Sequence, residues 1–222
     1  MRTFGTFGIP SRPGRSQVVI GAETGSGKSH AFLIPVVSAA LARVRAAGQG
    51  VGDSQQLRPQ QPLALILTPN RELNAQIANM ARPLFGDALV RTAVLSGTQV
   101  LSSVDGAAKA ALGRPSQLPD VLVATPSALQ HNISVHGMSF LAQISWVVVD
   151  EVDMLLSVPY RRDTHRALFA LRRRYSPPSF IFAGATLPGA CPAVVTKSVR
   201  VCRCVVVLGV GNARAFRFYL ST

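Results

Sequence analysis

The segment from Val18 to Ser29 constrains the fold of this chain more than any other part of the sequence. It begins with the β-branched run Val18-Val19-Ile20, which predicts a buried strand, and ends with Gly25-Ser26-Gly27-Lys28-Ser29. Glycine adopts backbone conformations that other residues avoid, so Gly25 and Gly27 allow a tight turn in which successive N–H groups point inward. A strand, a glycine-rich turn and a helix start, in this order, predict a phosphate-binding loop.

Two residues of this loop carry most of the predicted chemistry. Lys28 would place a full positive charge at the β and γ phosphates of a nucleotide, and the hydroxyl of Ser29 would ligate Mg²⁺. A simple strand-to-helix turn is the alternative interpretation, and the flanking strand and helix patterns disfavour it. The predicted nucleotide-binding residues are Ala22, Glu23, Thr24, Gly25, Ser26, Gly27, Lys28 and Ser29.

The rest of the chain alternates short apolar strands with helical patterns, which indicates an α/β fold with a mostly parallel sheet. Strands that are apolar on both faces fit a sheet covered by helices on both sides. We expect strands at 18–20, 63–67, 89–95, 121–123, 146–149 and 180–182. We expect helices at 30–47, 71–84 and 160–174, with shorter ones at 107–112 and 127–133, and a surface insertion at 48–62.

A second candidate site follows the predicted strand 146–149. Three carboxylates occur within four residues there, at Asp150, Glu151 and Asp153. Carboxylates this close repel one another unless a cation relieves them, so a divalent ion is the natural partner. Asp150 would hold Mg²⁺ through water, and Glu151 would orient or deprotonate an attacking water. An acidic turn after a strand is the alternative, and the phosphate loop earlier in the chain disfavours it.

These segments together resemble the DEAD-box family of RNA helicases, over about residues 9–197. Residues 22–29 are similar to the AxTGxGK[ST] loop of that family, in which alanine at the first position is normal. Further motifs follow in the family's order: Pro69-Asn70-Arg71-Glu72-Leu73 for PTREL, Ser96-Gly97 for a GG pair, Thr125-Pro126 for the start of TPGR, Asp150 to Asp153 for DEAD, and Gly184-Ala185-Thr186 for SAT.

The resemblance implies a single RecA-like P-loop domain that binds ATP and Mg²⁺ and holds RNA by its backbone without reading the bases. Catalysis would rest on Glu151, Lys28 and Asp150, with Ser29 and Asp150 at the metal. RNA contacts are implied for Pro69, Arg71, Gly97, Thr125 and Pro126. Coupling of hydrolysis to RNA remodelling is implied for Asp153, Gly184, Ala185 and Thr186.

Three departures from the family pattern have expected consequences. Gly184 lacks the hydroxyl that connects this motif to the acidic strand end, so we expect weak or uncoupled activity. Ser127-Ala128 replaces Gly-Arg and loses one phosphate contact. Val152 replaces alanine at a position that we expect to be buried. We expect binding to survive the changes at Ser127-Ala128 and Val152.

The length of 222 residues suffices for one such domain, which we place at residues 1–200 with a divergent tail at 201–222. The adenine-reading glutamine of the family would fall near Gly5, where none occurs. We expect the second RecA-like domain to be absent, and with it the arginine that stabilises charge on the γ-phosphate. The chain alone would hydrolyse ATP slowly unless a second domain or an activating protein assists.

Charge supports a polyanionic partner. The chain has 23 Lys and Arg against 10 Asp and Glu, a net charge of +13, and no acidic residue follows Asp163. Such a field attracts nucleic acid, although a compositional bias towards arginine also explains the total. Cys191, Cys202 and Cys204 lack metal-ligand spacing and are expected to be reduced thiols.

We expect no membrane span, because no sufficiently long apolar run occurs. Residues 1–15 contain three arginines and no acid, which resembles a transit peptide without its usual length. An intracellular location is therefore expected, in a chloroplast or mitochondrion or else in the nucleus or cytoplasm. Two other functions stay open: a catalytically impaired RNA- or partner-binding module, and another P-loop ATPase.

Overall fold

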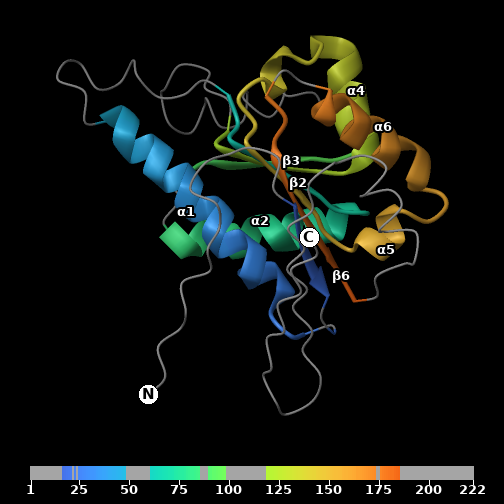
Figure 1. The fold of residues 1–222 in the computed structure, drawn as a ribbon, viewed down its shortest axis with the longest axis horizontal. Helices are drawn as coiled ribbons and strands as arrows, with labels where there is room; N and C mark the ends of the chain where they lie inside the picture. Colours follow the sequence, from blue (N-terminus) through green and yellow to red (C-terminus); the bar gives the residue numbers. More distant parts are fainter. Residues whose placement is uncertain are drawn as a thin grey trace, which may run out of the picture.

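The computed structural model describes residues 17–21, 23, 25–48, 61–85, 90–98, 119–173 and 176–185. Within them six strands form one sheet in the order β1-β6-β5-β2-β4-β3 (Figure 1). All neighbouring strands pair in parallel, so the predicted α/β fold is confirmed. The strands are β1 (Gln17–Gly21), β2 (Ala64–Leu67), β3 (Thr92–Leu95), β4 (Val121–Ala124), β5 (Trp146–Val149) and β6 (Ser179–Gly184).

Helices cover both faces of this sheet (Figure 1). The helices are α1 (Lys28–Gly48), α2 (Arg71–Phe85), α4 (Pro126–His136), α5 (Val152–Leu155) and α6 (Arg161–Arg172), with a 3-10 turn η1 at Ser139–Leu141. The four longer ones match predicted helices, whereas α5 and η1 are too short to leave a periodic pattern. No helix in the described part of the chain is long and apolar enough to cross a membrane.

Several sequence-based expectations lie outside the described residues. They are the helix at 107–112, most of the insertion at 48–62, the three cysteines and the tail at 201–222.

The two faces of the sheet form two separate hydrophobic layers, because side chains alternate along each strand. Leu65 and Leu67 pack with residues of α4 and α6 such as Leu129 and Leu171. Ala64 and Ile66, from the same strand, pack instead with residues of α1 and α2. Each fully buried leucine or isoleucine contributes about 1.5–3 kcal/mol to the free energy of folding. Both layers of helices are therefore packed stably on the sheet.

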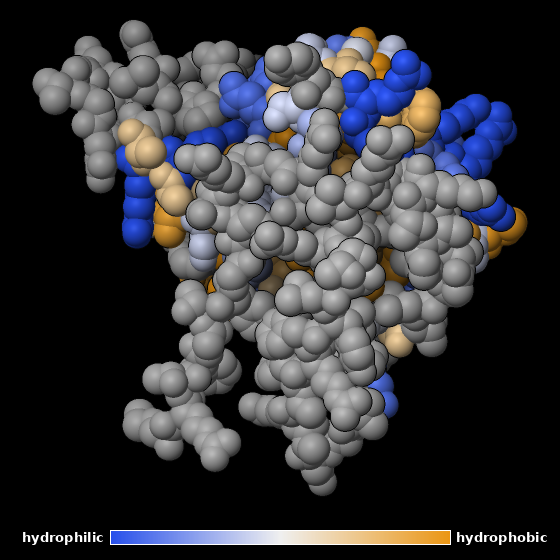
Figure 2. Space-filling model, in the orientation of Figure 1, coloured by the Kyte–Doolittle hydropathy of each residue, from blue (hydrophilic) through white to orange (hydrophobic). Residues whose placement is uncertain are grey.

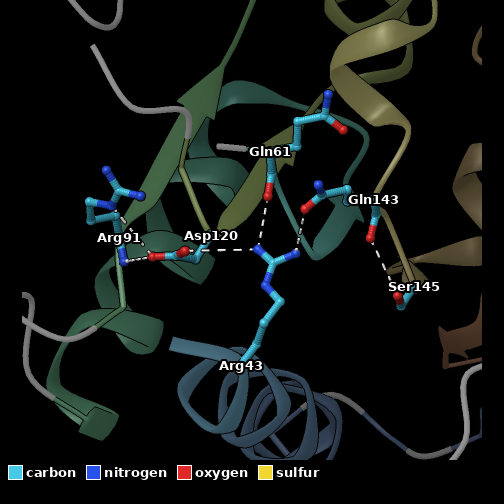
Figure 3. A network of polar contacts seen from close by, with 6 residues as sticks. All are labelled: Arg43, Gln61, Arg91, Asp120, Gln143 and Ser145. Carbon is cyan, nitrogen blue, oxygen red and sulfur yellow. Dashed lines mark hydrogen bonds and ion pairs between the residues drawn. The ribbon is translucent and has the colours of Figure 1, made fainter. Parts of the chain in front are cut away.

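A polar network closes the edge of the sheet at which the strands begin (Figure 3). The Asp120 side chain, 1% exposed, lies just before β4 and receives the backbone N–H of Arg91 at 2.9 Å. Arg43 reaches in from α1, with Nη2 3.9 Å from Asp120 Oδ1 and donating to the Gln61 carbonyl at 2.8 Å. Its Nη1 donates to Gln143 Oε1 at 3.5 Å. These contacts join α1 to the chain that enters β2, β3, β4 and β5.

Candidate nucleotide-binding and nucleic-acid-binding site

The predicted functional segments all follow the carboxyl ends of strands, and the parallel sheet brings those ends to one edge. In register, Gly21 of β1 lies beside Gly184 of β6, and Phe182 of β6 beside Val149 of β5. Across the other half of the sheet, Leu67 pairs with both Val149 and Ala124. The loops after β1, β5, β2, β4 and β3 therefore form one functional edge, which lies opposite the Asp120 network.

The phosphate loop has the backbone that the sequence predicts. Gly25 and Gly27 have φ values of 80° and 91°, and nothing lies within 4 Å of the Cβ that either position would carry. Conformation, and not lack of space, thus requires glycine there. Gly25, Ser26 and Gly27 are exposed, so the loop is open to a ligand. Ala22 and Thr24 lie outside the described residues.

Lys28 and Glu151 connect the phosphate loop to the acidic strand end. Lys28 is the first residue of α1, and its side chain is only 7% exposed. Its Nζ lies 4.0 Å from Oε1 of Glu151, which follows β5. The first turn of α1 adds the partial positive charge of a helix N-terminus at the same place. The cation predicted to bind phosphate and the carboxylate predicted to act on water are thus adjacent.

Asp150 is a buried carboxylate at the end of β5, 4% exposed. Its backbone N–H donates to the Leu67 carbonyl at 2.9 Å, and its Oδ1 accepts the N–H of Glu151 at 3.0 Å. Burial raises the pKa of Asp150 from 3.8 to about 6. The Glu151 and Asp153 charges add to this rise, while the Glu151 amide and Lys28 oppose it. A cation at Asp150 would offset the cost of keeping this carboxylate charged.

The residues present fit a magnesium ion. The Asp150 carboxylate and the Ser29 hydroxyl supply the hard oxygen ligands that Mg²⁺ prefers. Within the described ranges, no group of three or more His, Cys, Asp or Glu could hold a metal by itself.

The predicted RNA-side residues occupy the loops after β2, β3 and β4. Arg71 is exposed at the start of α2, whereas Pro69, two residues earlier, is buried. Gly97 has a φ of 61°, which favours glycine. Thr125 caps α4, because its Oγ1 accepts the Ala128 N–H at 3.4 Å. Pro126 is the first residue of α4 and does not precede it, which places the helix start one residue earlier than expected.

Residues 9–193 match the DEAD/DEAH box helicase family. The chain belongs to this family. It is 32% identical over 170 residues to DEAD-box ATP-dependent RNA helicase 22 of Arabidopsis thaliana, covering 74% of this chain and 27% of that protein. It is 35% identical over 191 residues to DEAD-box ATP-dependent RNA helicase 10 of Arabidopsis thaliana, covering 82% of this chain and 36% of that protein.

The fold agrees with the family. The structure of Mss116p bound to ssRNA and AMP-PNP matches with a TM-score of 0.67 at 23% identity, covering 88% of this chain and 37% of that chain. The matched part of the chain covers 27% and 36% of the two Arabidopsis relatives, so it spans about a quarter to a third of their length. The predicted family membership and RecA-like architecture are confirmed.

Glu151 of this DEAD-box chain has a strained backbone that the sequence did not reveal. Its φ of 49° and ψ of 52° lie in the left-handed region, and no other non-glycine residue of the described chain has a positive φ. Such a conformation costs about 1–2 kcal/mol for an ordinary residue. This left-handed conformation turns the chain from β5 into α5, at the residue that is predicted to act on water.

Asn74 is a further residue that the sequence analysis missed. It lies on α2, is fully buried, and accepts a hydrogen bond from Thr68 Oγ1 at 2.6 Å. Its Nδ2 donates to the Leu95 carbonyl at 3.1 Å and to Ser96 Oγ at 3.0 Å. One amide thus ties the loop after β2 to the loop after β3. The sequence offered one signal for this role. Asn74 is a polar residue one helical turn before Ile77, and both lie on the buried face of α2.

The predicted coupling residues lie on α5 and at the end of β6. Asp153 is half-buried on α5, and Gly184 is the last residue of β6, beside Gly21. Ala185 is exposed, and Thr186 lies outside the described residues. Val152 is fully buried, as predicted.

Proposed function

We propose that this chain is the ATP-binding domain of a DEAD-box RNA helicase. It binds Mg-ATP at the loop after β1 and RNA backbone at the loops after β2, β3 and β4. Paired with a second RecA-like domain, it hydrolyses ATP to remodel RNA. Its relatives DEAD-box ATP-dependent RNA helicase 22 and DEAD-box ATP-dependent RNA helicase 10 are named for this activity, which supports the proposal.

The observation that carries the proposal is the juxtaposition of Lys28 and Glu151 across 4.0 Å, beside the buried Asp150. A phosphate on the loop competes with Glu151 for the Lys28 ammonium. Lys28 then turns to the β and γ phosphates, which frees the Glu151 carboxylate to accept a proton from the attacking water. A bound Mg²⁺ would neutralise phosphate charge, held by Asp150 and Ser29.

Completion by a second domain is part of the proposal, because in this family that domain supplies the arginine that stabilises charge on the γ-phosphate. Arg71, which is exposed at the functional edge, is assigned to RNA instead. Arg172 and Arg173 end α6 on the side of the sheet where β6 begins, and the Arg173 guanidinium lies over the Phe169 ring at 5.4 Å. Arg43 and Arg91 belong to the Asp120 network at the opposite edge. The second domain would supply the cation for the charge that develops on the γ-phosphate.

The direct test measures nucleotide binding and ATP turnover of the 222-residue chain, with and without RNA. We expect Lys28→Ala to abolish ATP binding, while Arg45→Ala, an exposed arginine late in α1, leaves it unchanged. Turnover should be slow and should rise when a second RecA-like domain is supplied. Brisk RNA-stimulated hydrolysis by the chain alone would contradict the need for a second domain.

A second candidate function is an RNA- or partner-binding module without turnover. The observation that favours it is Gly184, which offers no hydroxyl at the end of β6, the strand that pairs with β5. The two functions differ in one measurement. A helicase domain hydrolyses ATP slowly and loses this activity in Glu151→Gln, whereas a binding module shows the same background rate in both proteins.

A further inference from the structure

The exposed side of α6 has a concentration of positive charge that the proposed nucleotide and RNA sites do not use. Residues 161–173 contain five arginines, Arg161, Arg162, Arg166, Arg172 and Arg173, and one acidic residue, Asp163. Arg162 and Arg166 are exposed, and the opposite side of the helix is buried against the sheet through Ala167 and Leu171. Hydrophilic surface gathers over this region, at the upper right of Figure 2.

An aromatic ring interrupts these arginines on the same stripe. Phe169 is 58% exposed, so its ring is accessible on the polar face of the helix. Arg162, Arg166, Phe169 and Arg173 follow one another at helical spacings of four, three and four residues, so they lie along one line of α6. The Arg173 guanidinium lies 5.4 Å from the centre of the Phe169 ring.

The helix that carries this stripe packs against the helix at the predicted RNA site. Helix α4 begins at Pro126, after its cap Thr125. It packs against α6 in the same hydrophobic layer, through residues such as Leu129 and Ala167. Helix α4 contains no acidic residue. A polyanion that leaves the start of α4 towards α6 therefore meets little negative charge.

We propose that the exposed stripe of α6, formed by Arg162, Arg166, Phe169 and Arg173, is a second contact surface for single-stranded RNA. Arginines along a helix neutralise backbone phosphates, and an exposed ring provides a platform on which a base stacks. The inference rests on the proposed function, since it extends the RNA path from α4. An acidic protein segment would match the charge but gives no reason for the exposed ring.

The test compares two double variants of equal charge. Arg162→Gln with Arg166→Gln removes charge from the stripe, and Arg45→Gln with Arg82→Gln removes the same charge from α1 and α2, where both arginines are exposed. Affinity for a labelled oligouridylate is measured over a series of KCl concentrations. Each lost phosphate contact lowers the salt slope by about 0.7, so the stripe variant should lose about 1.4. We expect its affinity at low salt to fall about tenfold.

Phe169→Ser provides an independent measurement, because removal of an exposed ring leaves the core and the charge intact. We expect weaker RNA binding with an unchanged salt slope. Nucleotide affinity and urea unfolding should match the parent for all variants, which excludes a folding defect.

The outcomes separate two failures. If the parent binds RNA and the stripe variant keeps the same affinity and slope, the α6 surface is not an RNA contact. If the parent binds Mg-ATP but no RNA, the proposed function itself is contradicted. If the stripe variant loses binding to poly-glutamate but not to oligouridylate, the surface serves an acidic protein and the RNA proposal is overturned.

Discussion

The side-chain amide of Asn74 donates a 3.0 Å hydrogen bond to Ser96 Oγ, in the loop after β3. Asn74 thereby helps to tie this loop to the loop after β2. Ser96 stands where the family usually has glycine, and Asn74 supplies its partner from α2. The bond is fully buried, and a third residue, Thr68, closes the network by donating to Asn74 Oδ1. Two of the loops predicted to hold RNA are therefore positioned by one side chain.

Asn74→Leu should lower stability and RNA affinity together. The substitution removes the buried hydrogen bonds to Thr68, Leu95 and Ser96, and each lost hydrogen bond costs about 0.5–1.5 kcal/mol. The Thr68 hydroxyl keeps the Asn70 carbonyl as a partner, and the Leu95 carbonyl keeps the Thr125 N–H. Urea unfolding measures the loss, with Gln76→Leu on the exposed side of α2 as the control. Nucleotide affinity of the folded fraction should change less than RNA affinity. Equal losses of both would assign Asn74 a purely structural role.

Glu151→Gln should slow ATP hydrolysis and leave ATP binding at least as tight as in the parent. The amide cannot accept the proton of the attacking water, and it no longer holds the Lys28 ammonium away from phosphate. The Glu151 side chain is 30% exposed, so the gain in affinity stays within a few-fold. Binding titrations and single-turnover rates measure both effects, and Glu72→Gln on α2 is the matched control. Hydrolysis at the parent rate would remove Glu151 from the base role.

Glu151→Gly should stabilise the nucleotide-free protein while abolishing hydrolysis. Glycine adopts the left-handed backbone of this position without strain, which is worth about 1 kcal/mol. The comparison is Asp153→Gly, two residues later within α5, where the same change should destabilise the protein. Thermal unfolding of both variants measures the difference. A less stable Glu151→Gly protein would mean that the left-handed backbone is not strained in solution.

Asp150 should make the stability of the magnesium-free protein decrease as the pH rises from about 4 to about 6. The folded-state pKa is raised to about 6 from 3.8, so within this window the folded state binds more protons than the unfolded state. By linkage, the free energy of unfolding then falls with rising pH, by at most about 3 kcal/mol. Urea titrations across the window measure it. Asp150→Asn should flatten this dependence, and an equally steep decrease in that variant would assign it to another group.

Asp120→Ala should destabilise the fold without altering the functional edge. Its carboxylate is buried between Arg43 and Arg91, and removal of one partner from such a network costs about 3–5 kcal/mol. Asp163→Ala, a half-buried acid on α6, should cost far less. ATP affinity measured on the folded fraction should be unchanged in both. Loss of ATP affinity at constant stability would show that this network acts on the nucleotide site.

The fold was largely predictable because local patterns and tertiary contacts agree along most of the chain. The strand Trp146–Val149 was predicted with its observed bounds, since its four apolar residues are buried on both faces of the sheet. Helix α2 was predicted to within one residue at its end. The four-residue helix α5 was missed, because a single turn leaves no period in the sequence.

The sequence by itself determined the chemistry: a loop whose glycines must take positive φ, a lysine and a serine at a helix start, and carboxylates after a strand. Spacing and residue type suffice for these, since they follow from the backbone conformations and charges of consecutive residues. Only the tertiary structure decided which distant groups meet. The parallel sheet brings Lys28 to Glu151 and Asn74 to Ser96, and it separates both pairs from Asp120 at the opposite edge. Contacts between residues far apart in the chain depend on strand order and register, which no local pattern encodes.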